Sequence, residues 1–121
     1  MEQDVMSRKV TEVIEDKNFE NWIRQRKGIF RFPVYPDTEA MQEDIMAMDL
    51  SVRSYNCLKR AGFTTIKSLV NGINGREDLM KIRNCGAKSQ TEIMLSIFLY
   101  QYAKMKPEKR AAYQNRVLEM N

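Results

Sequence analysis

Residues 50–62 read LSVRSYNCLKRAG and carry the clearest local signal in the sequence. Ser51 suits a helix N-cap, because its hydroxyl can accept a hydrogen bond from a free amide of the first turn. Ala61 and Gly62 suit the end of that helix, because glycine readily adopts the left-handed backbone that closes many helices. The stretch therefore predicts a short helix from Ser51 to about Arg60.

The pattern of short helices continues downstream. Thr64 or Thr65 can cap a second helix, and residues 71–75 hold two Asn-Gly pairs whose flanks do not alternate, which favours a helix–helix loop. Three more helices are predicted beyond this loop, at about 76–83, 89–104 and 107–119. Pro107 suits the first position of the last one. The first of the three is expected to turn three side chains inward, Leu79, Met80 and Ile82.

A tight turn is predicted at residues 84–89, which read Asn-Cys-Gly-Ala-Lys-Ser. Gly86 would permit a positive φ and a close approach by another backbone. The helix that follows would point its free amides outward, where its dipole favours an anion, and Lys88 and Ser89 add a cation and a hydroxyl. This is the logic of a helix–hairpin–helix phosphate clamp, although a glycine followed by a serine is also a common purely structural cap.

The N-terminal part of the protein follows a different pattern. Residues 5–27 read as helical, and Asp16 or Asn18 can cap a second short helix within them. Residues 28–36 are aromatic and contain two prolines, a composition unlike that of a flexible linker. We therefore expect an extended connector that lies over another part of the protein.

Three segments follow from these patterns. Residues 1–43 form a helical and extended extension of unknown role, residues 44–104 form a helical domain, and residues 105–121 form a C-terminal helix. Both outer segments contain large apolar side chains, among them Trp22 and Tyr113. We expect these side chains to pack against the domain.

Charge is unevenly distributed along the 121 residues. The whole protein has 20 basic and 16 acidic residues and a net charge of +4, but residues 1–44 carry −3 and residues 45–121 carry +7. A basic C-terminal part indicates a polyanionic partner, and it is also compatible with a solvated basic face.

Composition argues against catalysis and metal binding. The sequence has no His, the commonest general base and metal ligand, and two Cys without His do not complete a zinc site. There is no nucleophile–base pair, paired-carboxylate site or Walker loop, so we expect no enzyme, no catalytic residue and no cofactor.

Composition also bears on location. The longest nearly apolar run, residues 93–100, is too short to cross a bilayer, so no membrane partner is expected. Glu2 and Asp4 stand where a signal peptide would carry basic residues, and two Cys are too few for a disulfide scaffold. A cytoplasmic protein is expected.

Residues 44–95 resemble the C-terminal domain of the bacterial RNA polymerase alpha subunit. The resemblance is carried by residues 50–62, by DLMKIRNCGAKS at residues 78–89, and by Glu92 and Ile93. It implies an all-α, SAM-domain-like fold, a compact bundle of short helices with a helix–hairpin–helix-like turn. Because the family's large N-terminal domain has no counterpart in these residues, we expect a stand-alone small protein with an alpha-type domain.

The resemblance also implies a function, which is binding to the minor groove of double-stranded A·T-rich DNA upstream of promoters. By that resemblance Arg53 enters the groove, with Asn56 and Cys57 beside it. The residues that grip the DNA backbone are Gly86, Lys88 and Ser89, and Glu92 orients the basic side chains.

The sequence departs from the family at Cys85 and Ala87, where the family often has a leucine and a further basic residue. An alternative function is that of a protein-binding adaptor or decoy that uses the same fold to bind sigma factor, a transcription activator or RNA polymerase without binding DNA. The acidic and aromatic N-terminal segment favours this alternative.

Overall fold

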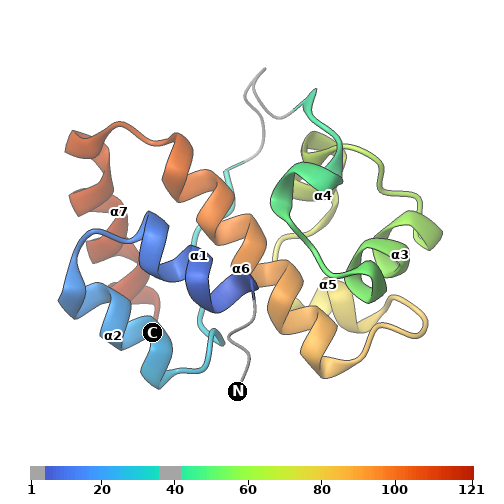
Figure 1. The fold of residues 1–121 in the computed structure, drawn as a ribbon, viewed down its shortest axis with the longest axis horizontal. Coiled ribbons are helices and arrows are strands. Elements are labelled where there is room, and N and C mark those ends of the chain that lie inside the picture. The colour runs from blue at the N-terminus through green and yellow to red at the C-terminus, as the bar shows by residue number, and fades with distance from the viewer. Residues whose placement is uncertain (1–4, 36–41) are drawn as a thin grey trace.

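The computed structural model describes residues 5–35 and 42–121, and every regular element within these ranges is helical (Figure 1). The elements are, in order along the sequence, α1 (Val5–Val13), α2 (Lys17–Gln25), the 3-10 helix η2 (Ile45–Met48), α3 (Val52–Arg60), α4 (Ile66–Gly72), α5 (Arg76–Met80), α6 (Ala87–Lys104) and α7 (Pro107–Met120). The predicted all-α fold is confirmed. Residues 1–4 of the predicted extension and Pro36 of the predicted connector lie outside the described residues.

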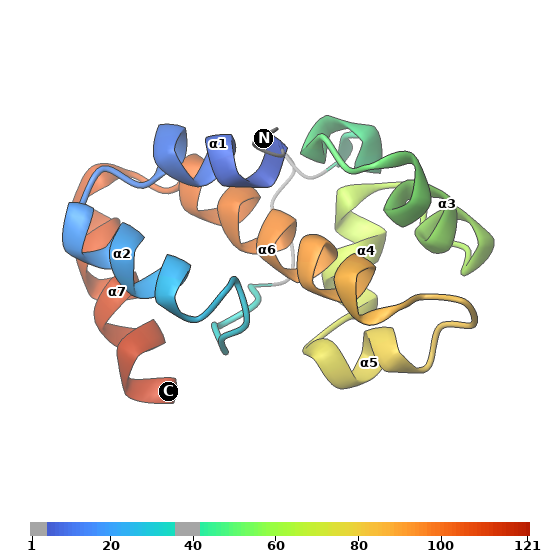
Figure 2. The ribbon, with the colours of Figure 1, turned by 60° about the horizontal axis from the view of Figure 1, so that its bottom comes forward.

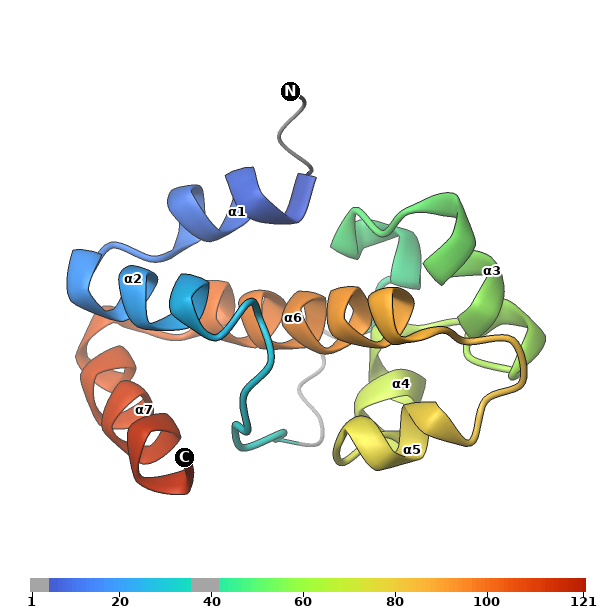
Figure 3. The ribbon, with the colours of Figure 1, turned by 90° about the horizontal axis from the view of Figure 1, so that it is seen from below.

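The long helix α6 runs through the middle of the molecule (Figures 2 and 3). α1, α2 and α7 lie around its C-terminal half, and η2, α3, α4 and α5 lie around its N-terminal half. Every residue from 93 to 102 is buried. A helix that is enclosed on all sides needs packing partners around its whole circumference, and here they come from both ends of the sequence.

The starts of the helices follow from caps that the sequence predicts. Ser51 Oγ accepts a hydrogen bond from the amide of Ser54 at 3.2 Å and begins α3. Thr65 begins α4 with a reciprocal capping box, and Asp16 begins α2. Pro107 occupies the first turn of α7, as expected. These side chains satisfy amides that a helix leaves without internal partners, so they fix where each helix starts.

Two predicted details of α5 and α6 are wrong. α5 ends at Met80 rather than near Arg83, and the Met80 side chain is 65% exposed whereas Leu79 is buried. A helix this short turns only a narrow face to the core. α6 begins earlier than predicted, because Gly86 already acts as its N-cap and its carbonyl accepts a hydrogen bond from the amide of Gln90 at 2.9 Å.

Phe98, in the middle of α6, joins the outer segments to the rest of the protein. Its ring is fully buried. Five aromatic rings lie with centroids 5.0–6.0 Å from it, and they belong to Phe19, Phe30, Phe32, Tyr102 and Tyr113. The expectation that both outer segments pack against the domain is therefore confirmed at this cluster.

The connector that follows α2 is extended and held in place by hydrogen bonds. Asn121 at the end of α7 pairs with the backbone of Arg31 through both its amide and its carbonyl, at 2.8 and 2.9 Å. The Tyr113 hydroxyl donates to the carbonyl of Pro33 at 2.8 Å, and the amide of Tyr35 donates to Gln101 at 2.8 Å. The connector thus lies over α6 and α7, as its composition predicts.

A polar network ties α1 to α2. Arg24 donates to Glu20 Oε2 at 3.0 Å and to the carbonyl of Ser7 at 2.8 Å. Thr11 and Lys17 also donate to the Glu20 carboxylate. These hydrogen bonds, that from Arg24 foremost, lower the pKa of the Glu20 carboxyl below its ordinary value of 4.5. The charged carboxylate is therefore the form that the folded protein favours.

Phe98→Ala is expected to destabilise the whole protein by about 3–5 kcal/mol, because it leaves a cavity at the centre of the aromatic cluster. Urea denaturation followed by circular dichroism measures the change. Val52→Ala, at a side chain that is 76% exposed, is the control and should change stability by less than about 0.5 kcal/mol. A loss below about 1 kcal/mol for Phe98→Ala would contradict this account of the core.

Glu20→Gln is expected to lower stability at neutral pH and to matter little in acid. The folded-state pKa of Glu20 is lowered, so its contribution is present above about pH 4.5 and is lost as the pH falls through the folded-state value. Thermal melts of both proteins at pH 7 and pH 3 check this. The gap between the two melting temperatures should shrink at pH 3, and an unchanged gap would argue against an ionised Glu20 as the stabilising species.

Candidate nucleic-acid interface

An open depression of about 700 Å³ lies where α3, α5 and the start of α6 meet. We call it the turn depression, because residues 81–86 between α5 and α6 form much of its wall. Four of its lining side chains are cationic, and none is acidic: Arg53, Lys81, Arg83 and Lys88. The folded protein therefore concentrates positive charge in one concave place.

Arg53 is placed by the start of α3. The Ser51 cap makes Arg53 one of the first residues of the helix, and the burial of Ser54, Cys57 and Leu58 turns the opposite face of α3 to the core. Arg53 itself is exposed. Within residues 5–35 and 42–121, no carboxylate forms an ion pair with Arg53. Its guanidinium is free to meet an anion.

Glu92 on α6 fixes the position of this helix start. Its carboxylate accepts hydrogen bonds from the amide of Ser51 at 3.0 Å and from the Ser51 hydroxyl at 2.8 Å. These bonds join the first turn of α3 to α6. Glu92 therefore holds the backbone that carries Arg53.

The turn between α5 and α6 differs from the predicted geometry. Gly86 has φ −71° and ψ 170°, so the positive φ expected there is wrong, and the left-handed residue is Asn84 with φ 63°. Asparagine tolerates this conformation better than most residues, so it makes the bend and leaves Gly86 extended. A Cβ added at Gly86 would meet nothing within 4 Å. Replacing Gly86 with valine would therefore cause no strain from a left-handed backbone.

The remaining predicted site residues differ in their access to solvent. Asn56 and Lys88 are exposed on α3 and on the first turn of α6. Cys57 has no exposed surface and Ser89 is 5% exposed. The Cys57 side chain therefore does not reach the surface that its neighbours form, and we leave it out of the interface.

Further cations beside the turn were missed by sequence reasoning. A second depression of about 520 Å³ lies on the other side of residues 81–84 and is lined by Arg60, Lys81 and Arg83. Arg83 directly precedes Asn84 in the quoted motif, and Arg60 follows Arg53 by seven residues, which is two helical turns on the same face. The spacing on α3 could have identified Arg60, whereas Arg83 required the path of the turn.

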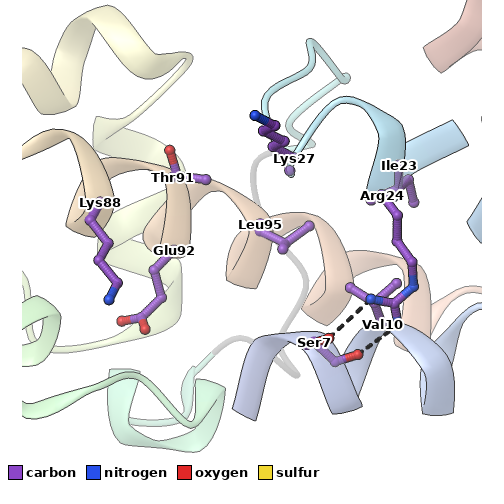
Figure 4. A pocket seen from close by; sticks show the side chains of 10 residues that line it. Ser7, Val10, Ile23, Arg24, Lys27, Lys88, Thr91, Glu92 and Leu95 are labelled. Atoms are coloured by element: carbon purple, nitrogen blue, oxygen red, sulfur yellow. Dashed lines mark hydrogen bonds between the residues drawn. The ribbon is translucent and has the colours of Figure 1, made fainter. Parts of the chain in front are cut away.

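A third depression, of about 410 Å³, lies where α1 and the end of α2 meet α6 (Figure 4). We call it the joint depression. Its floor is apolar, and Lys27 and Lys88 stand on its edges (Figure 4). Lys88 also lines the turn depression. One lysine therefore belongs to both surfaces.

Metal sites and membrane-spanning helices were the other features sought among the described residues. Within residues 5–35 and 42–121, no group of three His, Cys, Asp or Glu side chains is placed to hold a metal ion. In the same part of the protein, no helix combines the length and apolar character that crossing a membrane requires.

Comparisons with known proteins identify the family to which half of the sequence is similar. Residues 35–96 match the family model for the C-terminal domain of the bacterial RNA polymerase alpha subunit. DNA-directed RNA polymerase alpha subunits from Oceanobacillus iheyensis, Heliobacterium modesticaldum and Bacillus velezensis are 49%, 50% and 51% identical over 59, 58 and 55 residues. The matches cover 49%, 48% and 46% of this protein but only 18%, 18% and 17% of those subunits. No solved structure matches it.

Cys57 and Cys85 are expected to react slowly with alkylating reagents in the folded protein. Both are buried and their thiols contact one another. Burial and the neighbouring Cys57 raise the pKa of Cys85 to about 12, so the reactive thiolate is scarce at pH 8. Mass spectrometry after iodoacetamide treatment, with and without urea, measures the difference. Rapid modification without urea would show that the junction of α3 and the turn is open.

Proposed function

Because the protein belongs to the family of C-terminal domains of the bacterial RNA polymerase alpha subunit, we propose that it is a transcription-related protein that binds double-stranded A·T-rich DNA through the turn depression. The observation that carries the proposal is the cluster of four cations there, without an acidic residue in the lining. Lys81 is 3.9 Å from Asp78, and the other three form no ion pair among the described residues.

Arg53 is the proposed minor-groove residue. A narrow A·T minor groove has an enhanced negative potential and presents acceptors, whereas a guanidinium carries only donors. Arg53 is exposed at the start of α3, and Asn56 follows it at the next turn. Both side chains can therefore approach the same groove.

The turn and the start of α6 are the proposed phosphate contacts. The first amides of an α-helix have no internal acceptor and favour an anion. At the start of α6 the N-cap is Gly86, which has no side chain that could accept hydrogen bonds from these amides. The open space beside Gly86 leaves room for a DNA backbone, and Lys88 adds a cation within the same turn. Ser89 is mostly buried, so we assign it a supporting position and propose Arg83 as an additional contact.

We propose that residues 44–104 are the DNA-binding unit and that residues 1–43 and 105–121 support it. Supporting this division, the turn depression is lined only by residues from 53 to 89. The outer segments pack on the far half of α6. In this arrangement the DNA-binding surface of residues 44–104 stays exposed, while the outer segments cover α6.

A second candidate function is binding to a protein of the transcription machinery, such as RNA polymerase, sigma factor or an activator. Val52 and Met80 are 76% and 65% exposed. Val52 precedes Arg53 in the sequence, and Met80 lines the turn depression together with Arg53. Exposed apolar side chains beside a charged residue are common in protein interfaces. Loss of partner binding in Val52→Ser or Met80→Ser without loss of DNA binding would support this function.

Arg53→Ala is expected to weaken binding to an A·T-rich duplex by about 1–3 kcal/mol and to have much less effect on a G·C-rich duplex. Lys88→Ala should weaken both duplexes about equally and lower the slope of log K against log salt by about one. Fluorescence anisotropy at several salt concentrations measures both effects.

Thermal melting is the control for these variants, because exposed charges contribute little to stability and both should melt near the wild type. If the wild-type protein shows no salt-dependent duplex binding at low ionic strength, the DNA-binding proposal fails and the protein-binding function takes precedence. Equal losses for Arg53→Ala on both duplexes would refute the minor-groove role.

A further inference from the structure

We propose that the N-terminal extension enlarges the DNA-binding surface, with Lys27 at the end of α2 contacting a phosphate of the same duplex that Lys88 contacts. This inference rests on the proposed DNA-binding function. It gives a role in recognition to a segment outside the residues that match the family.

The joint depression places Lys27 and Lys88 on one surface. Lys88, Thr91, Glu92 and Leu95 all line it, and their spacing of three, four and seven residues puts them on one face of α6. Lys27 stands across the depression from this face (Figure 4). Since Lys88 also lines the turn depression, positive charge continues from Arg53 through Lys88 to Lys27.

The backbone at the end of α2 holds Lys27 in this place. Lys27 has φ 56° and Gly28 has φ 75°, two consecutive left-handed residues that reverse the direction of the backbone. A Cβ added at Gly28 would lie 3.3 Å from Leu95 Cδ2 and 3.4 Å from Thr91 Cγ2, so the turn is seated directly on α6. Lys27 and Gly28 close α2 as a Schellman cap, in which the amide of Lys27 donates to the carbonyl of Arg24 at 3.0 Å and that of Gly28 to the carbonyl of Ile23 at 3.3 Å.

Among the cations at the end of α2 and in the turn that follows it, Lys27 differs in having no ion pair or ring contact within the described part of the protein. Arg24 is committed to Glu20 and to Ser7, and Arg26 lies over the Trp22 ring with its guanidinium carbon 4.5 Å from the centroid. Lys27 is exposed and has no ion pair among residues 5–35 and 42–121. It is the cation of this turn that is free for a ligand.

The chemistry of the surface favours a DNA backbone. Its cations are exposed and spread over two open depressions, which suits an extended polyanion that carries regularly spaced phosphates. Glu92 is the acidic group in the lining of the joint depression, and its carboxylate already accepts two hydrogen bonds from Ser51. Two exposed lysines, Lys27 and Lys88, line the depression beside this one carboxylate.

Lys27→Gln tests the inference in the full-length protein. We expect about three- to tenfold weaker binding near 0.1 M salt, equally on A·T-rich and G·C-rich duplexes, and a salt slope lower by about one, because one phosphate contact is lost. Lys109→Gln is the matched control. It removes the same charge from an exposed position on α7, at the opposite end of the molecule from α3 (Figure 1).

The outcomes separate the inference from the function on which it rests. Wild-type affinity and slope in Lys27→Gln, together with weak binding by Arg53→Ala and Lys88→Ala, would overturn the inference and leave the DNA-binding proposal intact. Equal losses in Lys27→Gln and Lys109→Gln would overturn it as well, since they would reflect net charge alone. A wild-type protein without salt-dependent duplex binding would overturn both proposals. A thermal melt of Lys27→Gln close to that of the wild type excludes misfolding as the cause of a loss.

Discussion

Burial of α6 on all sides is the constraint on which the rest of the structure depends. Residues 93–102 are buried without interruption, and their enclosure requires α1, α2 and α7 on one half of the helix and the short helices on the other. Removing α2 or α7 would expose apolar surface around Phe98, where burial of a single aromatic residue is worth several kcal/mol. The outer segments are therefore part of the core that positions the site.

Charged residues are divided between two tasks. Ion pairs between distant segments fasten the extension to the rest of the protein: Lys9 with Asp49, Arg110 with Glu15 and Lys104 with Glu43. Around the turn depression the cations are left mostly unpaired, and the acid nearest to the start of α3, Glu92, is held by Ser51. The backbone of the site is thus held in place while most of its positive charges have no ion-pair partner among the described residues. This combination suits the binding of a polyanion.

Local signals in the sequence were sufficient for the starts of α3 and α4, because the caps Ser51 and Thr65 act within one turn, but they misplaced the start of α6. They did not determine which residue of the α5–α6 turn takes the left-handed conformation. Both Asn84 and Gly86 can do so, and in the structure it is Asn84. Burial of Cys57 suits a small apolar side chain, whereas its placement on the DNA-binding surface came from the family resemblance, which does not encode how α3 is rotated against α6.

The position of Lys27 follows from the same packing requirement that encloses α6. α2 packs along α6, and the close approach of Gly28 to Thr91 and Leu95 puts the end of α2 one to two helical turns from Lys88. Packing of the core therefore places the side chain of Lys27 beside the proposed phosphate contacts. Any cation there adds to their field, so an extension that stabilises the fold also adds charge to the DNA-binding surface without a separate recognition element.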